Sequence, residues 1–206
     1  MLTKLQRTLK FHLNNNFTYY IILLCGFICG GIIAAVCVWK MSEFDYKELS
    51  VYFNDFFSGI NKTGADSLEI FRMSVLSNFK LYIFIILLSM MIIGYPILPL
   101  ISATLGYSVF FALFFVFKAY TVKGALFYLC AMFPHHLISF PCHGAALMNS
   151  MQFSISIIKG KTEIKNRFLG YLIKMLILFL ITVLSSLLQG YIEPVLIRLI
   201  SRLFLM

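Results

Sequence analysis

The chain has 206 residues, of which 61% are hydrophobic and only 12% are charged, and its formal net charge at pH 7 is +9. Soluble domains contain about 45–50% apolar and about 25% charged residues, so the composition excludes an ordinary soluble domain. The positive charge suits a protein that lies against anionic lipid headgroups. Because the basic residues form no basic face in the sequence, nucleic-acid binding is not expected.

Long apolar runs define the fold class. A helix needs about 20 apolar residues to cross a bilayer, and four runs reach that length: residues 17–39, 81–117, 124–158 and, interrupted only by Lys174, 168–192. The two middle runs are too long for one span each. The sequence therefore predicts an all-α polytopic membrane helix bundle, with about five spans and a re-entrant or broken helix.

The amino-terminal segment, residues 1–16, is basic and is expected to lie in the cytoplasm. The apolar run at 17–39 exceeds the roughly 7–15 residues of a signal-peptide core and ends without an A-x-A site, so we interpret it as a retained first span. Gly26, Gly30 and Ala34 follow one another at four-residue spacing. Small residues so placed predict a face on which a neighbouring helix packs closely.

Residues 40–80 form the only sizeable polar region and carry six of the eight acidic residues. Apolar residues recur at three- and four-residue steps between Tyr46 and Ile60, which predicts an amphipathic helix. A turn follows at 61–64, and Thr63-x-x-Asp66 resembles a capping box that opens a second helix reaching Lys80. We expect an extracytoplasmic helical segment.

The aromatic face of this segment has two interpretations. It either lies on the bilayer or on the protein's own spans, or it is a docking surface for a partner. The candidate partner-binding residues are Tyr52, Phe53, Phe56 and Phe57.

The membrane bundle is expected to cover residues 81–192. "GYPILP" at 94–99 supplies a break, because proline removes a helix donor and disfavours helix in the preceding residue. The basic loop at 159–167 and the basic amino terminus both favour a cytoplasmic amino terminus. The tail, 193–206, has apolar residues on one side and arginines on the other, which predicts an interfacial helix.

The stretch "FPHHLISFPCH" (133–143) lies within a run free of charged residues. A zinc site is disfavoured, because adjacent His135 and His136 point about 100° apart on a helix and no span supplies a carboxylate. A proton path would also need intramembrane acids. We favour a structural role, in which Pro134 and Pro141 break the helix and the imidazoles bond the freed carbonyl groups.

No catalytic constellation is present. The sequence lacks G-x-S-x-G, H-E-x-x-H and P-loop motifs, and its acids are spread over a helix surface. We therefore expect a protein that is not an enzyme and that needs no cofactor and no metal.

With the spans placed, the chain resembles stage II sporulation protein M and its wider family of membrane proteins. That family carries a P-H-G-x-x-E-x-P-A motif, which appears here at 134–142. It also tends to have an asparagine where the second span begins, glycines further along that region, and an E-A-x-x-x-P-like pattern, echoed here at 189–194. The resemblance assigns a structural motif to Asn78, Gly94, Gly106, Pro134, His135, Pro141 and Pro194.

The chain departs from the family pattern at three positions. His136 replaces the glycine of the motif, Ser139 replaces its glutamate, and Gln189 replaces the later glutamate. If those acids carry transport or proton chemistry in other members, this chain has lost it.

The resemblance implies a role in endospore formation. Protein M is then a non-enzymatic scaffold that places stage II sporulation proteins D and P, which are peptidoglycan hydrolases, at the septal or engulfing membrane. The segment at 40–80 is the candidate contact. The alternative is a permease- or channel-like subunit, which the broken helices favour and the expected absence of an intramembrane acid disfavours.

Overall fold

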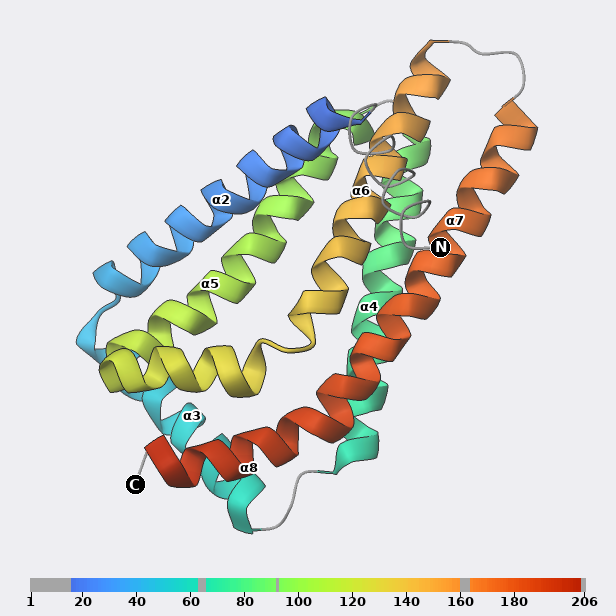
Figure 1. Ribbon diagram of the computed structural model, residues 1–206. Helices are drawn as coiled ribbons and strands as arrows, with labels where there is room; N and C mark the ends of the chain where they lie inside the picture. Colours follow the sequence, from blue (N-terminus) through green and yellow to red (C-terminus); the bar gives the residue numbers. More distant parts are fainter. Residues whose placement is uncertain (1–15, 63–65, 92, 160–163, 205–206) are drawn as a thin grey trace, which may run out of the picture.

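The computed structural model describes residues 16–62, 66–91, 93–159 and 164–204, without the side chains of 54, 56–62, 132, 164–166 and 200–204. Within these ranges every regular element is helical (Figure 1). The helices are α2 (Phe17–Lys40), α3 (Glu43–Lys62), α4 (Ser67–Met90), α5 (Gly94–Phe127), α6 (His136–Ile158), α7 (Ile164–Leu187) and α8 (Glu193–Phe204), with π-helical turns at Tyr128–Met132 and Leu188–Ile192.

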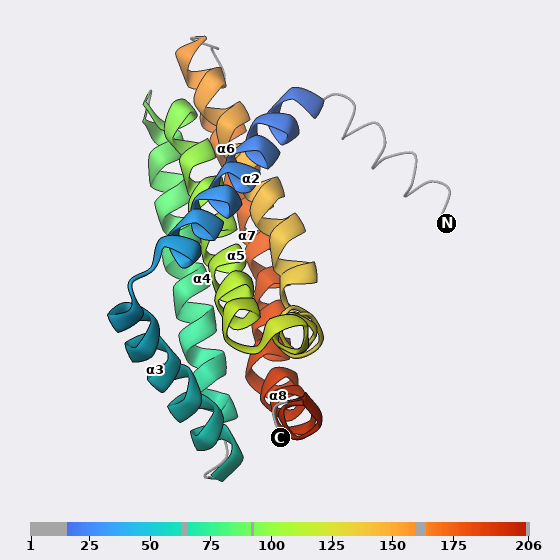
Figure 2. The same ribbon diagram turned by 90° about the vertical axis from the view of Figure 1, so that its left-hand side faces the viewer.

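Five long helices, α2, α4, α5, α6 and α7, run side by side, and α6 lies among the others (Figures 1 and 2). Four stretches are long and apolar enough to cross a membrane: Phe17–Lys40, Ser67–Met90, Gly94–Ala131 and Arg167–Leu199. Helix α6 is also long enough to cross a membrane, but it is more polar than these four stretches. Ten of its residues are buried. The prediction of an all-α membrane bundle is confirmed.

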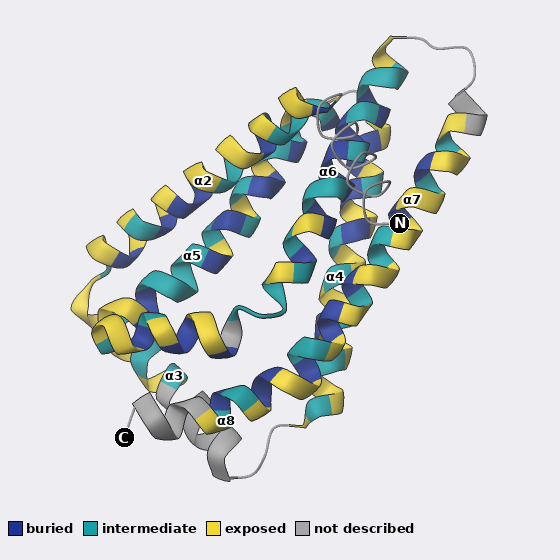
Figure 3. Cartoon of the chain, viewed as in Figure 1, coloured by how far each residue is buried: buried dark blue, intermediate teal, exposed yellow. Residues whose placement is uncertain are grey.

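Apolar side chains cover the outside of the bundle, as expected for a surface in contact with lipid. Exposed residues follow the outer faces of α2 and α7, whereas buried residues face inward (Figure 3). The core between α4, α6 and α7 includes Ile85, Met148, Met151 and Met175. The bundle thus buries a core while keeping an apolar exterior.

The three remaining helical segments gather at one end of the bundle and form what we call the end layer: α3, α8 and the cross segment, residues 122–132 (Figure 1). The cross segment begins where α5 changes direction at Thr121, whose φ of 58° lies in the left-handed region. It then passes under the bundle to the start of α6. The last turn of α6 and the first turn of α7 lie at the opposite end of the bundle (Figure 1).

The predicted packing face of the first span is confirmed. Helix α2 packs along α5, and Gly30 and Ala34 are buried there. A Cβ atom on Gly30 would come within 1.9 Å of the carbonyl oxygen of Ala103. One on Gly106, across the contact, would come within 2.1 Å of the carbonyl oxygen of Phe27. Only glycine permits this approach of the two backbones.

The proline-rich breaks fall partly where the sequence places them. The chain turns between α4 and α5 after Met91, where a Cβ atom on Gly94 would lie 1.8 Å from the carbonyl oxygen of Leu88. A second break precedes α6 at Pro134. The expectation of a further break at Pro141 is wrong, because α6 continues through it.

The polar region contains the two expected helices, but the second is longer than expected. Asp66 caps α4, since its Oδ1 accepts hydrogen bonds from the amides of Leu68 and Glu69 at 3.1 and 3.3 Å. Thr63 lies outside the described residues. Helix α4 does not end at Lys80 but continues to Met90, so the polar segment and the second span share one helix.

We expect the end layer to lie outside the cell and the α6–α7 turn to lie in the cytoplasm, because the basic loop 159–167 accompanies that turn. In a chain without its native cysteines, Ser67→Cys should react with a membrane-impermeant maleimide in intact cells. Thr162→Cys should react only after permeabilisation. Labelling of Thr162→Cys in intact cells would reverse this orientation.

Candidate functional site

Two interrupted helices meet where the bundle joins the end layer. Each carries a π-helical turn that ends two residues before a proline, at Pro134 and Pro194. In the first turn the amide of Phe133 donates to the carbonyl oxygen of Tyr128 at 3.0 Å. Because proline has no amide hydrogen, it cannot continue the regular hydrogen-bond ladder, and the helix ends or changes course beside each of these prolines. Helix α8 packs against the first π turn and directly continues the second.

At this junction a histidine and a glutamate are paired. Nδ1 of His135, which follows Pro134, contacts Oε1 of Glu193, which precedes Pro194. Glu193 is only 6% exposed and lies within the candidate span Arg167–Leu199. Glu193 is the first residue of α8, at the end of the bundle. Glu193 directly follows the run 168–192, and only the fold brings it back beside His135.

A backbone carbonyl beside the break is bound by two serines. The hydroxyls of Ser139 and Ser185 donate to the carbonyl oxygen of His135 at 2.8 and 2.7 Å. The expectation that imidazoles bond such carbonyls is wrong, since the described bond of the His135 ring is to Glu193. Ser139, which replaces the family's glutamate, thus stabilises the broken backbone.

A polar cavity of about 320 Å³ lies beside this pair, between α4, α5 and α6. Its polar lining includes Ser74, Asn78, Ser108, His136, His143 and Gln189. Asn78 donates to Ser186 Oγ at 3.1 Å, and Ser74 donates to Gln189 Oε1 at 2.6 Å. Gln189, the other replaced acid, therefore links α4 to the end of α7.

Two further histidines line the polar cavity in different ways. His136 stacks on Phe140, with ring centroids 4.6 Å apart and planes at 6°. His143 is 6% exposed, and neither of its ring nitrogens has a hydrogen-bond partner among the described residues. Its ring lies 5.9 Å from that of Tyr82. Among the described residues, no group of three His, Cys, Asp or Glu side chains is placed to hold a metal ion.

The residues of the expected structural motif fall into two groups. Asn78, Pro134, His135 and Pro194 converge on the junction and the polar cavity. Gly94 and Gly106 lie elsewhere and permit close backbone approaches. Pro141 lines a second cavity, on the α2 side of α6.

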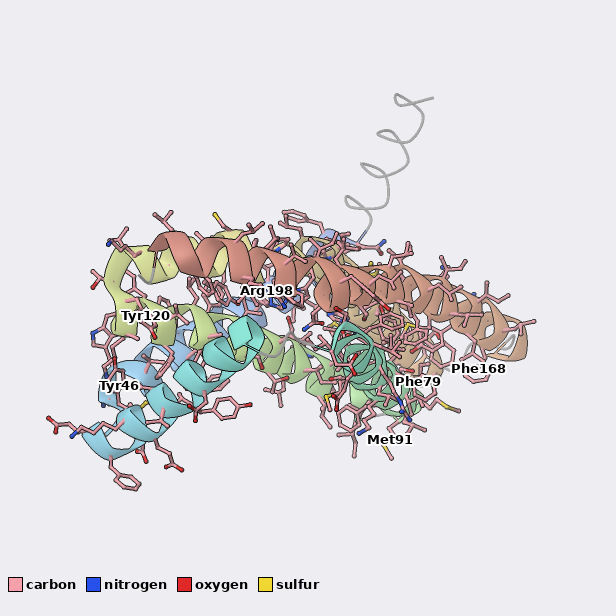
Figure 4. The ribbon with its side chains drawn as sticks, turned by 90° about the horizontal axis from the view of Figure 1, so that it is seen from below. Tyr46, Phe79, Met91, Tyr120, Phe168 and Arg198 are labelled. Carbon is pink, nitrogen blue, oxygen red and sulfur yellow. The ribbon has the colours of Figure 1, made fainter. Side chains whose placement is uncertain are left out.

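The described candidate partner-binding residues lie on different faces of α3. Phe53 packs against Phe115 with ring centroids 4.9 Å apart and planes tilted by 32°, and the centroid of the Tyr46 ring lies 5.7 Å from that of Phe115. Seen from below, Tyr46 lies beside the end of α5 near Tyr120 (Figure 4). Tyr52, in contrast, is 68% exposed. The side chains of Phe56 and Phe57 lie outside the described residues.

One protein family, described as stage II sporulation protein M, matches residues 21–194, which cover most of the chain. The chain belongs to this family. It is therefore a sporulation-related protein, and its candidate spans make it a multi-pass membrane protein. No curated protein and no solved structure matches the chain. For this member of the stage II sporulation protein M family, the matched region includes Pro134, Glu193 and the polar cavity.

Proposed function

We propose that the protein is a non-enzymatic scaffold of the engulfment machinery, which positions peptidoglycan hydrolases at the septal or engulfing membrane. Stage II sporulation proteins D and P are its proposed partners, and they would carry out the cell-wall chemistry. Family membership supports the sporulation context. The observation that carries the scaffold role is the two-faced packing of α3.

One face of α3 is held against the bundle. Its Tyr46 and Phe53 pack on Phe115, which is 1% exposed, and Lys118 lies with Nζ 5.1 Å from the centroid of the Tyr46 ring. Nζ of Lys118 also donates to the carbonyl oxygen of Val38 at 2.8 Å, so α2, α3 and α5 are joined at this point. The inner face therefore fixes the helix in one orientation.

The other face of α3 is exposed. Phe44, Val51 and Tyr52 are 75%, 59% and 68% exposed, and Glu48 is exposed beside them. Aromatic side chains held on a rigid element are favoured anchors in protein interfaces, because little conformational entropy is lost when they bind. An extracytoplasmic enzyme could bind this face without disturbing the bundle.

The docking test changes Phe44 and Tyr52 together to leucine, which preserves apolar character but removes the aromatic shape. If these side chains anchor the partner, capture of protein D or P from sporulating cells should weaken by about 30-fold, the equivalent of roughly 2 kcal/mol. Membrane levels should remain normal, because neither side chain packs in the core.

A matched control is Phe84→Leu, since Phe84 is 52% exposed but lies on the span α4. This change should leave capture unaltered. Undiminished capture by the Phe44→Leu/Tyr52→Leu protein would contradict docking on this face of α3.

The second candidate function is a transport subunit. The specific observation in its favour is the buried Glu193 beside His135 at the edge of the polar cavity, because ionisable groups in membrane regions often line solute or proton paths. A transport subunit does not need the exposed face of α3, so the docking test separates the two functions.

A further inference from the structure

His143 is in an unusual position for a histidine. It is 6% exposed, and both ring nitrogens are buried without a partner among the described residues. Leaving a buried donor or acceptor unsatisfied costs roughly 1–3 kcal/mol. Nearby polar groups do bond to one another: Tyr82 and Thr182 hydroxyls are 2.9 Å apart, for example. The exception at His143 indicates a partner outside the described residues, and a bound molecule would supply one.

His143 lines two open cavities, one on each side of α6. The first is the polar cavity toward α4. The second, also about 320 Å³, lies between α6, α2 and α5, and Leu24, Phe27 and Leu147 line it. Volumes of roughly 300–1,000 Å³ are typical of small-molecule sites. The imidazole thus lies between a polar space and an apolar one, which suits an amphiphilic molecule.

The polar cavity opens on the side of the bundle. Ser77 and Ser108, at its edge on α4 and α5, are exposed. Ser108 lies within the candidate span Gly94–Ala131, so this opening faces the membrane. Molecules that reach it come from the lipid phase.

The lining favours an uncharged headgroup. Its polar members are hydroxyl, carboxamide and imidazole groups, and no lysine or arginine is among the described lining residues. A phosphate would be expected to meet arginine or lysine. Carboxamides, hydroxyls and imidazoles donate and accept hydrogen bonds in the manner that a polyol requires.

We propose that the polar cavity binds the uncharged, hydroxyl-bearing headgroup of a membrane lipid, with His143 as a hydrogen-bonding side chain. Its neighbours Asn78 and Gln189 supply further polar groups, and the lipid chains lie along the apolar exterior. This site is separate from the exposed face of α3, so it does not depend on hydrolase docking.

Native mass spectrometry of the purified full chain in detergent tests the proposal. The probes are diacylglycerol and monoglucosyl diacylglycerol, compared with phosphatidylglycerol and phosphatidylethanolamine of the same acyl chains. The wild-type protein should retain the two uncharged lipids in preference to the two phospholipids. His143→Leu should weaken that retention by about tenfold or more, because a lost hydrogen bond to a buried group corresponds to at least 1.4 kcal/mol.

Three controls separate binding from folding. His143→Leu should fold at least as stably as wild type, since leucine fills the space without an unsatisfied polar atom. His143→Gln restores hydrogen bonding and should recover retention. Asn149→Leu, on the same helix but lining a different cavity, should leave retention unchanged. Equal retention of phosphatidylglycerol, retention of no lipid, or full retention by His143→Leu would each overturn the proposal.

Discussion

Replacing His135 with leucine should lower the free energy of unfolding by roughly 3–5 kcal/mol, because it leaves Glu193 buried without its partner. The expectation holds whether the shared proton lies on the imidazole or on the carboxyl group, since either form loses its hydrogen bond. The measurement is the fraction of detergent-solubilised protein that remains monodisperse after graded heating or denaturant.

The double variant His135→Leu/Glu193→Leu is the decisive control. Replacing both partners of a buried polar pair by apolar groups is often nearly neutral. The double variant should therefore be more stable than His135→Leu alone, which gives a coupling energy in a double-mutant cycle. If the two single effects simply add, the contact between the two residues contributes nothing to the fold.

Replacing Gly30 or Gly106 with alanine should also destabilise the protein, by roughly 1–3 kcal/mol or more. The added Cβ atoms would lie 1.9 and 2.1 Å from carbonyl oxygens of the opposing helix, so α2 and α5 must separate. Both glycines lie in the contact between α2 and α5. The loss of stability in the double variant should therefore be smaller than the sum of the losses in the two single variants. The same heating or denaturant series measures the loss.

Gly144 and Gly170 provide matched helical controls. Nothing lies within 4 Å of a Cβ atom added at either position. Because alanine favours helix over glycine by about 1 kcal/mol, Gly144→Ala and Gly170→Ala should be neutral or stabilising. Destabilisation of similar size at all four glycines would show that the close contact of α2 with α5 is not the cause.

Features that depend on local sequence were predictable. The apolar runs gave the membrane bundle, and the spacing of Gly26, Gly30 and Ala34 gave the face on which α5 packs. A break near Gly94 was predictable from its glycine and prolines, although α5 begins at Gly94 and continues through Pro99. Each of these features depends on residues within one helix or one turn. The spacing or the type of those residues is therefore enough to predict it.

Features that depend on distant contacts were not predictable. His135 and Glu193 are 58 positions apart, and neither residue alone indicates the other. The three- and four-residue period of α3 predicted an amphipathic helix but could not show that Phe53 faces inward while Tyr52 faces outward. Breaks were expected at both Pro134 and Pro141; the first is present, but α6 continues through Pro141.

The pairing of His135 with Glu193 has a consequence for biogenesis. A membrane protein emerges from the ribosome from its amino terminus, so α5 and α6 are synthesised before α7 and α8. Until the last span has been inserted, His135 lacks its partner and the broken backbone at Pro134 lacks the hydroxyl of Ser185. A chain that stops before α7 would therefore leave the imidazole of His135 without its partner at this end of the bundle. A membrane protease or chaperone can recognise an unpaired polar group of this kind. Once synthesis is complete, α7 and α8 supply its hydrogen-bond partner and bury it.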